Sequence, residues 1–284
     1  MEVRAPTFEA RLAEMIHEIS GRRVLPDEVM GLDSLGHAEL ALAIQEEFGV
    51  WLPDGTGPGT VRETARAVQE RLPVTGRTPP LRPGIGSIHP LGKAVTAPIL
   101  DRYYGLEVEG AERVPSEGPV VLASNHDSFV DIPLLVRAVP RPIWFMAKQE
   151  LFRWRFWAWF FHALGGFPVG RDRHDLSAVR AALAVLRWGR VLGMFPEGTR
   201  SVQLLPFLRG AAWMALVTGA PIVPLRITGT ADSMPPGSLW PRRSHVRIAF
   251  GQAMRPGLEP DPRARLERAR EVTADLRTAV EGLA

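Results

Sequence analysis

Cysteine is missing from this sequence of 284 residues, which excludes disulfide bonds and thiolate metal sites. A reducing compartment is thereby permitted. Long apolar runs are missing as well, and the longest, residues 156–164, is too short to cross a bilayer. Residues 1–4 include an acid and no apolar segment, so we expect no signal peptide. The histidines show no paired spacing, and we therefore expect no metal site.

The charge is divided unevenly along the chain. Residues 1–75 hold 7 Arg and 13 Asp or Glu, a net charge of −6, whereas residues 76–284 hold 27 Lys or Arg and 18 Asp or Glu, a net charge of +9. An acidic segment followed by a basic one indicates two domains with different partners. The basic part shows no zinc-finger spacing and no RNA-binding signature. We therefore expect phosphorylated substrates or anionic lipid as partners, and no nucleic acid.

The acidic segment, residues 1–75, has the apolar spacing of a small helical bundle. The pattern predicts a first helix that ends before Gly21, a second over 34–48 and a third over 61–72. A capping box at residues 60–63 precedes the third helix. Without further chemistry, such a bundle is an interaction domain.

The second helix opens with Asp33-Ser34-Leu35. On its own, this pattern predicts an N-cap at Asp33 or Ser34. Together with the order of the three helices and the acidic second helix, the motif resembles the acyl or peptidyl carrier protein family. The resemblance implies that Ser34 carries covalent 4′-phosphopantetheine, attached by a phosphopantetheinyl transferase. A helix N-terminus favours the phosphodiester of such a group.

Proline and glycine make up seven of the fifteen residues from Pro73 to Ser87, so no packed element is expected there. We assign residues 76–87 as a linker. Proline-rich spacers run extended at about 3 Å per residue, so this segment can separate two domains by roughly 40 Å. It either lets a tethered carrier reach the neighbouring domain or joins two domains without a mechanical role.

Strand and helix patterns alternate through the basic segment, residues 88–284. The alternation favours an α/β fold: a small all-α bundle followed by an α/β domain around a central mixed sheet. Strands are predicted at 106–109, 120–123, 143–147, 191–195, 222–227 and 246–250. Helices are predicted at 88–104, 132–139, 176–188 and 263–280.

A histidine and an aspartate follow the second of these strands. His126 lies in the turn, and Asp131 lies five residues on, at the start of the next helix. A neutral imidazole can take a proton from a hydroxyl, and a carboxylate can fix its tautomer and stabilise the imidazolium. The alternative is a capped helix with a merely polar histidine.

Three further clusters follow predicted strands or turns. Gly165–Arg171 is a glycine-rich turn that ends in arginine, Pro196–Arg200 reads Pro-Glu-Gly-Thr-Arg, and Pro221–Pro224 flanks a strand with prolines. Arg171 and Arg200 can form a bidentate clamp on a phosphate, with Thr199 as an added donor. Each cluster alone is a weak signal, because a surface arginine is usually just solvated.

The blocks that start at His126, Gly166, Pro196 and Pro221 occur in an order that resembles the glycerolipid acyltransferase family, which includes 1-acylglycerol-3-phosphate acyltransferases. The resemblance covers residues 88–284. It implies that His126 is the general base and that Asp131 orients it. It further implies that the polar head of the acceptor is held by Arg171, Glu197, Gly198, Thr199 and Arg200.

Aromatic residues and two arginines crowd into residues 151–161. Such residues favour a bilayer interface, so we expect a monotopic membrane surface or an acyl entry there. The alternative is a buried core helix. The chain is expected in the cytoplasm, peripheral on the inner face of the membrane.

The sequence thus predicts an acyltransferase, similar to 1-acylglycerol-3-phosphate O-acyltransferases, that moves an acyl chain from a thioester to a hydroxyl of a lysophospholipid-like acceptor. In a first hypothesis the fused carrier supplies the acyl group; in a second it comes from acyl-CoA or a separate carrier. The fusion also suits a specialised pathway with a polyketide or amino-lipid intermediate. In a third hypothesis the chain is a carrier and membrane scaffold without activity, which the intact set of His126, Asp131, Glu197 and Arg200 disfavours.

Overall fold

The computed structural model describes residues 7–52, 59–70, 97–98, 100–163, 165–169, 176–234 and 241–283. Three helices form the N-terminal part: α1 (Phe8–Ser20), α2 (Ser34–Phe48) and α3 (Val61–Gln69). Side chains of Thr7, Asp33 and Thr60 cap their first turns. The three predicted helices are confirmed. The predicted linker, 76–87, lies outside the described residues.

Seven strands form one mixed sheet in the order β1-β7-β6-β2-β5-β3-β4. Only the β6–β7 pair is antiparallel, and every other neighbouring pair is parallel. The strands are β1 (Glu107–Glu109), β2 (Val120–Ser124), β3 (Ile143–Lys148), β4 (Gly166–Val169), β5 (Val191–Met194), β6 (Ile222–Thr228) and β7 (Arg247–Phe250). The α/β fold and the mixed sheet expected from the alternating pattern are confirmed.

Both faces of the sheet are buried, as continuous apolar strands require. One face lies under α7 (Leu176–Arg187), α8 (Gly210–Thr218) and α10 (Pro262–Glu281); the other lies under α5 (Asp131–Ala138) and a helical segment at 100–104. Within β2, Val121 and Ala123 belong to the first core, and Val120 and Leu122 to the second. Alternating side chains of one strand therefore anchor both layers.

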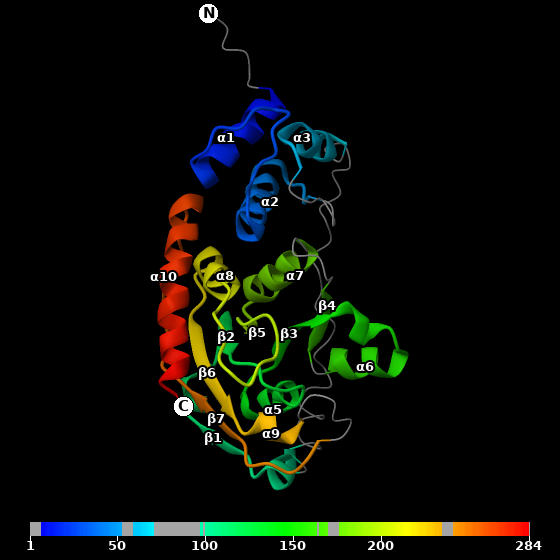
Figure 1. Ribbon diagram of the computed structural model, residues 1–284, viewed down its shortest axis with the longest axis vertical. Helices are drawn as coiled ribbons and strands as arrows, with labels where there is room; N and C mark the ends of the chain where they lie inside the picture. Colours follow the sequence, from blue (N-terminus) through cyan, green and yellow to red (C-terminus); the bar gives the residue numbers. More distant parts are fainter. Residues whose placement is uncertain are drawn as a thin grey trace, which may run out of the picture.

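One element differs from the sequence prediction. The segment expected as a glycine-rich turn forms strand β4, which pairs with β3 at one edge of the sheet. An edge strand tolerates Pro168 because one side of its backbone needs no partner. The aromatic segment forms α6 (Arg155–Ala163), which projects beside β4 (Figure 1). The expected helix at 88–104 is described only at 97–98 and 100–104, where it is helical.

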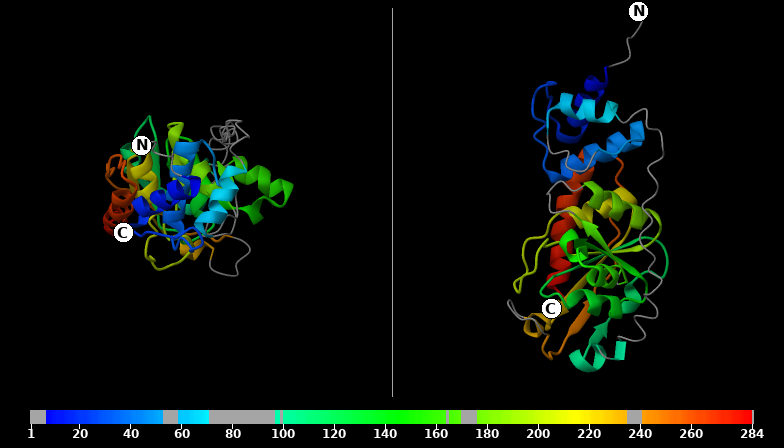
Figure 2. Two further views of the ribbon diagram at one scale, coloured as in Figure 1. Left: turned by 90° about the horizontal axis from the view of Figure 1, so that it is seen from above. Right: turned by 90° about the vertical axis from the view of Figure 1, so that its right-hand side faces the viewer.

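The N-terminal helices pack directly onto the α/β domain. Figures 1 and 2 show α1–α3 at one end of an elongated molecule, with α2 against α7 and α8 and with α1 beside the start of α10. The apolar core is continuous across this contact: Leu40 and Ile44 of α2 belong to the same buried cluster as Trp213 of α8 and Leu276 of α10.

Short 3-10 turns (Ala111–Arg113 and Gln149–Phe152) and helix α9 (Thr230–Ser233) complete the described elements. Of the helices within the described ranges, none combines the length and the apolar character needed to span a bilayer.

Candidate active site

The central strand β2 delivers the candidate site at its carboxyl end, between β5 and β6. Asn125 follows the strand and is buried. Its side chain accepts from the backbone N–H of Ile227 at 2.8 Å and donates to the Ile227 carbonyl at 2.9 Å. This double hydrogen bond fixes the end of β2 to the end of β6. The next residue, His126, therefore leaves the sheet from a rigid position.

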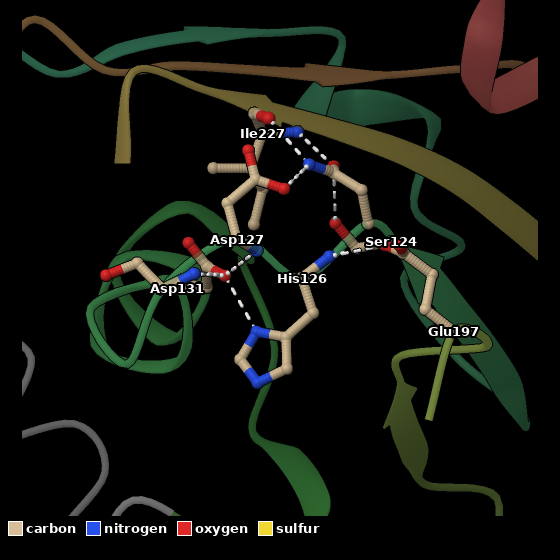
Figure 3. A network of polar contacts seen from close by, with 8 residues as sticks. Ser124, His126, Asp127, Asp131, Glu197 and Ile227 are labelled. Atoms are coloured by element: carbon tan, nitrogen blue, oxygen red, sulfur yellow. Dashed lines mark hydrogen bonds and ion pairs between the residues drawn. The ribbon is translucent and has the colours of Figure 1, made fainter. Parts of the chain in front are cut away.

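His126 and Asp131 form a direct pair (Figure 3). Nδ1 of the imidazole lies 2.7 Å from Oδ2 of Asp131. The same oxygen accepts the backbone N–H groups of Asp127 at 2.9 Å and Ser128 at 2.8 Å. A carboxylate with these donors is an acceptor only, so Nδ1 carries the hydrogen and Nε2 keeps its lone pair. The imidazole is thereby held in the tautomer that a general base requires.

The segment around Pro-Glu-Gly-Thr-Arg forms hydrogen bonds with the backbone of His126. Glu197 accepts the His126 N–H through Oε1 at 2.9 Å and the Leu205 N–H through Oε2 at 2.9 Å. The backbone N–H of Ser201 donates to the His126 carbonyl at 2.8 Å. Glu197 is buried, and both of its oxygens are engaged by backbone groups. It holds the catalytic turn and the 197–209 loop together.

Ring stacking completes the support of the imidazole. Phe195 stacks on His126 with 4.0 Å between ring centroids and 16° between planes. Sequence reasoning missed this contact, and also the role of Asn125. Phe195 precedes the Pro196–Arg200 segment, and Asn125 precedes His126. Proximity to these motifs was the only indication in the sequence that either residue belongs to the site.

The rest of the motif faces solvent. Gly198, Thr199 and Arg200 are exposed, and the Arg200 guanidinium carbon lies 3.6 Å from the ring centroid of Phe129. Gly198 has φ +69°, and a Cβ there would meet Leu208 at 2.9 Å, so glycine is required for this turn. No carboxylate pairs with Arg200 within the described residues.

Two charged side chains near the site, Asp127 and Arg226, are partly buried and incompletely paired. Burial raises the pKa of Asp127 to about 6; the hydrogen bond from Asn125 opposes this shift, and the charges of Asp131 and Glu197 add to it. Arg226 on β6 also opposes it. The Nε and Nη1 atoms of Arg226 are buried and have no hydrogen-bond partner among the described residues. Arg226 is not predicted from the sequence, because an arginine within a strand pattern is usually a solvated surface residue.

The structure brings four predicted residues together at the carboxyl ends of the central strands β2 and β5, as the motif order predicts: His126, Asp131, Glu197 and Arg200. Arg171 lies outside the described residues. Ser34 is not part of this group; it is exposed at the first turn of α2. Within the described ranges, no group of His, Asp or Glu is arranged to hold a metal ion.

This arrangement can accept a proton from a hydroxyl at Nε2 of His126 and return it to a leaving group. A family model described as Acyltransferase matches residues 105–228, which span the pair and the loop up to β6. The α/β domain and its site thus define an acyltransferase.

Comparisons with individual proteins narrow this class. The 1-acyl-sn-glycerol-3-phosphate acyltransferase of Bacillus subtilis (strain 168) is 34% identical over 135 residues, which cover 47% of this chain and 68% of that protein. The chloroplastic 1-acyl-sn-glycerol-3-phosphate acyltransferase BAT2 of Brassica napus is 34% identical over 141 residues, 48% of this chain and 41% of that protein. The chain belongs to the 1-acyl-sn-glycerol-3-phosphate acyltransferase family.

The fold is also that of a solved member of the family. The crystal structure of the 1-acyl-sn-glycerophosphate acyltransferase PlsC from Thermotoga maritima superposes with a TM-score of 0.54 at 24% identity, covering 88% of this chain and 94% of that one. At this identity the likeness concerns the fold.

Proposed function

We propose that this acyltransferase moves an acyl chain from a thioester to the free hydroxyl of a 1-acylglycerol 3-phosphate or a close relative of it. The observation that carries the proposal is the His126–Asp131 pair, whose 2.7 Å contact at Nδ1 leaves Nε2 available. The relatives of Bacillus subtilis and Brassica napus are named for acyl transfer to this acceptor, which favours it here.

The reaction needs one proton carrier. Nε2 of His126 takes the proton of the acceptor hydroxyl as the oxygen attacks the thioester carbonyl carbon. The carbon–sulfur bond then breaks, and the imidazolium returns the proton to the departing thiolate. Asp131 stabilises the imidazolium meanwhile. Such proton transfer contributes about 10²- to 10⁴-fold to the rate.

The phosphate of the acceptor binds at the exposed loop. Arg200 presents its guanidinium over Phe129 with no carboxylate partner among the described residues, which suits a bidentate phosphate contact. Thr199 and Gly198 lie beside it, and Arg171 is proposed to add a second cation. Arg226 supplies further positive charge near Asp127. Glu197 acts differently from the expected head-group contact: with both oxygens on backbone N–H groups, it is a positioning residue.

We propose further that α1–α3, within residues 1–75, are an acyl-carrier-like domain with phosphopantetheine on Ser34. Support comes from the exposed Ser34 at the first position of α2, while Asp33 caps the helix by accepting the Gly36 N–H at 2.8 Å. The hydroxyl is therefore free of the capping role. Bound there, the group would supply a thiol that holds an acyl chain.

The membrane is the proposed source of the acceptor, with the chain peripheral on the cytoplasmic face. Trp154 is 73% exposed and Trp159 57% exposed, and Arg153 and Arg155 beside them are exposed too. This favours an interfacial surface over a buried core helix. Replacing both tryptophans by alanine is expected to weaken co-sedimentation with vesicles that contain anionic lipid.

The proposed reaction is tested with purified protein, acyl-CoA and 1-acylglycerol 3-phosphate, following the diacyl product by mass spectrometry. His126→Ala is expected to lower kcat by at least about 10²-fold while the protein stays folded. His17→Ala, an exposed histidine in the last turn of α1, is the matched control and should leave kcat unchanged. Near-normal turnover by folded His126→Ala would overturn the assignment.

A further inference from the structure

Glu39 of α2 is buried at the contact between the N-terminal helices and the α/β domain. Its Oε1 accepts from the indole N–H of Trp213 on α8 at 2.5 Å, and its Oε2 accepts from Arg265 on α10 at 2.8 Å. Both carboxylate oxygens thus have partners in the other part of the chain. A buried carboxylate needs such partners, and moving α2 from this position would break both hydrogen bonds and leave Arg265 without its acidic partner.

A second contact lies at the start of the same helix. Asp33, which precedes Ser34, uses Oδ1 for its own helix cap and Oδ2 for an ion pair with Arg209. Arg209 directly precedes α8. The two contacts engage α2 at residues 33 and 39, which fixes the direction of the helix as well as its distance from α8.

The position of Arg209 relates this contact to the active site. Helix α8 leads through the turn at Gly219 into β6, so its first residues lie at the carboxyl edge of the sheet. His126 lies at the same edge. Leu208 donates to the Pro196 carbonyl at 2.8 Å and lies over Gly198. The 197–209 loop therefore begins at the residue that holds His126 and ends at the residue that holds Asp33.

We propose that α2 is docked in place as an internal donor platform, so that the acyl thioester carried on Ser34 is delivered to His126 of the same chain. Glu39, Trp213, Arg265, Asp33 and Arg209 are the residues that hold the platform. The inference rests on the carrier assignment of the proposed function and names its donor and its route. The step balances without a further reactant: the ester forms as the thioester C–S bond breaks, and His126 moves the acceptor proton to the thiolate.

Docking of α2 would favour delivery within one chain over delivery between chains. A tethered group experiences an effective concentration set by its attachment, and a fixed attachment point at the correct edge keeps that concentration high. A carrier that swings freely on a linker would need neither the buried Glu39 contacts nor the Asp33–Arg209 pair.

The first test uses hydrogen exchange of the unmodified protein. Arg209→Glu reverses one charge of the contact. Arg270→Glu reverses an exposed charge on α10 that forms no ion pair among the described residues. Arg209→Glu is expected to speed amide exchange in the first turns of α2, and Arg270→Glu is expected to leave it unchanged. Equal exchange in both variants overturns the docking.

The second test follows acyl loss from Ser34 by intact-protein mass spectrometry in single turnover with 1-acylglycerol 3-phosphate. The rate constant is expected to be independent of protein concentration and to fall about tenfold or more in Arg209→Glu. The rate with free acyl-CoA is measured in the same variant, and the ratio of the Ser34-linked rate to the acyl-CoA rate is expected to fall about tenfold. Transfer that scales with protein concentration, or a wild-type rate in Arg209→Glu, overturns the inference alone.

Failure of the proposed function gives different results. A chain that accepts no phosphopantetheine at Ser34 overturns the carrier assignment and this inference together, while the acyl-CoA reaction persists. A chain that never acylates 1-acylglycerol 3-phosphate from either donor overturns the proposed acceptor.

Discussion

Arg265 and Glu39 form an ion pair across 226 positions of sequence, at 2.8 Å, with side chains only 9% and 1% exposed. The pair joins the last helix to the second. Because water is excluded, the two charges depend on one another and on the Trp213 indole.

Removing the cation should therefore be costly. Arg265→Ala is expected to lower the free energy of unfolding by about 3–5 kcal/mol, since it leaves a buried carboxylate with one neutral donor. Urea unfolding followed by tryptophan fluorescence measures the change. Arg270→Ala, on the exposed side of the same helix, should stay within about 0.5 kcal/mol of wild type. A similar loss in both variants would show that the pair contributes nothing specific.

Stability should depend on pH through Glu39. Burial raises the pKa of Glu39 from 4.5 to about 7, with Glu46 and Asp261 adding to the shift and with Arg265 and Trp213 opposing it. A carboxyl with a raised pKa binds more protons in the folded state than in the unfolded state. Its contribution is therefore fully present below about pH 4.5 and is lost as pH rises through about 7.

The check is the difference between wild type and Glu39→Gln, which removes the titration and keeps the shape. The stability of wild type relative to this variant should fall between pH 5.5 and 7.5, whereas the other carboxylates, Asp127 included, cancel in the difference. A flat difference over this range contradicts the raised pKa.

Glu197 distinguishes positioning from acceptor binding. Glu197→Gln retains one acceptor oxygen but places an amide where a backbone N–H now donates. We expect kcat to fall about ten- to a hundredfold with KM for the acceptor little changed. Steady-state kinetics against 1-acylglycerol 3-phosphate provide the measurement. A rise in KM at constant kcat would assign Glu197 to the acceptor head instead.

Replacing Arg200 should change KM for the acceptor, in contrast to the change in kcat expected for Glu197. Arg200→Ala is expected to raise KM for a phosphate-bearing acceptor about ten- to a hundredfold, because a charge-assisted hydrogen bond to phosphate is lost. An acceptor without the phosphate should be affected little, and the thermal midpoint should not change, since the side chain is exposed. Arg153→Ala is the control for an exposed arginine elsewhere. Equal effects on both acceptors would exclude a phosphate contact.

Much of the sheet was predictable because its central strands are short apolar runs with clear ends. Strands β2, β5 and β6 begin at the predicted residue and end within one residue of the prediction. The edge strand β4 was missed, because Gly166 and Pro168 interrupt a strand pattern and only pairing with β3 makes it a strand. Local patterns carry no information about which neighbour is available.

In the site, too, features set by local sequence were predicted and features set by distant partners were not. His126, Asp131 and the loop at Glu197 were found by order and spacing. The direction of the Glu197 carboxylate was not predicted, because a sequence motif does not show whether an acidic side chain faces a ligand or bonds to the backbone. Glu39 was missed entirely as a contact residue, since an acid on a helix is usually solvated. Its partners come from α8 and α10, and no local pattern links them.

The long separation of Glu39 and Arg265 also has a consequence for synthesis. A ribosome makes α2 among the first elements and α10 last, so the carboxylate waits exposed while the intervening strands are translated. The N-terminal helices therefore cannot reach their final packing as an early folding unit. Assembly of the whole molecule is completed only when the last helix emerges and packs against α1 and α2.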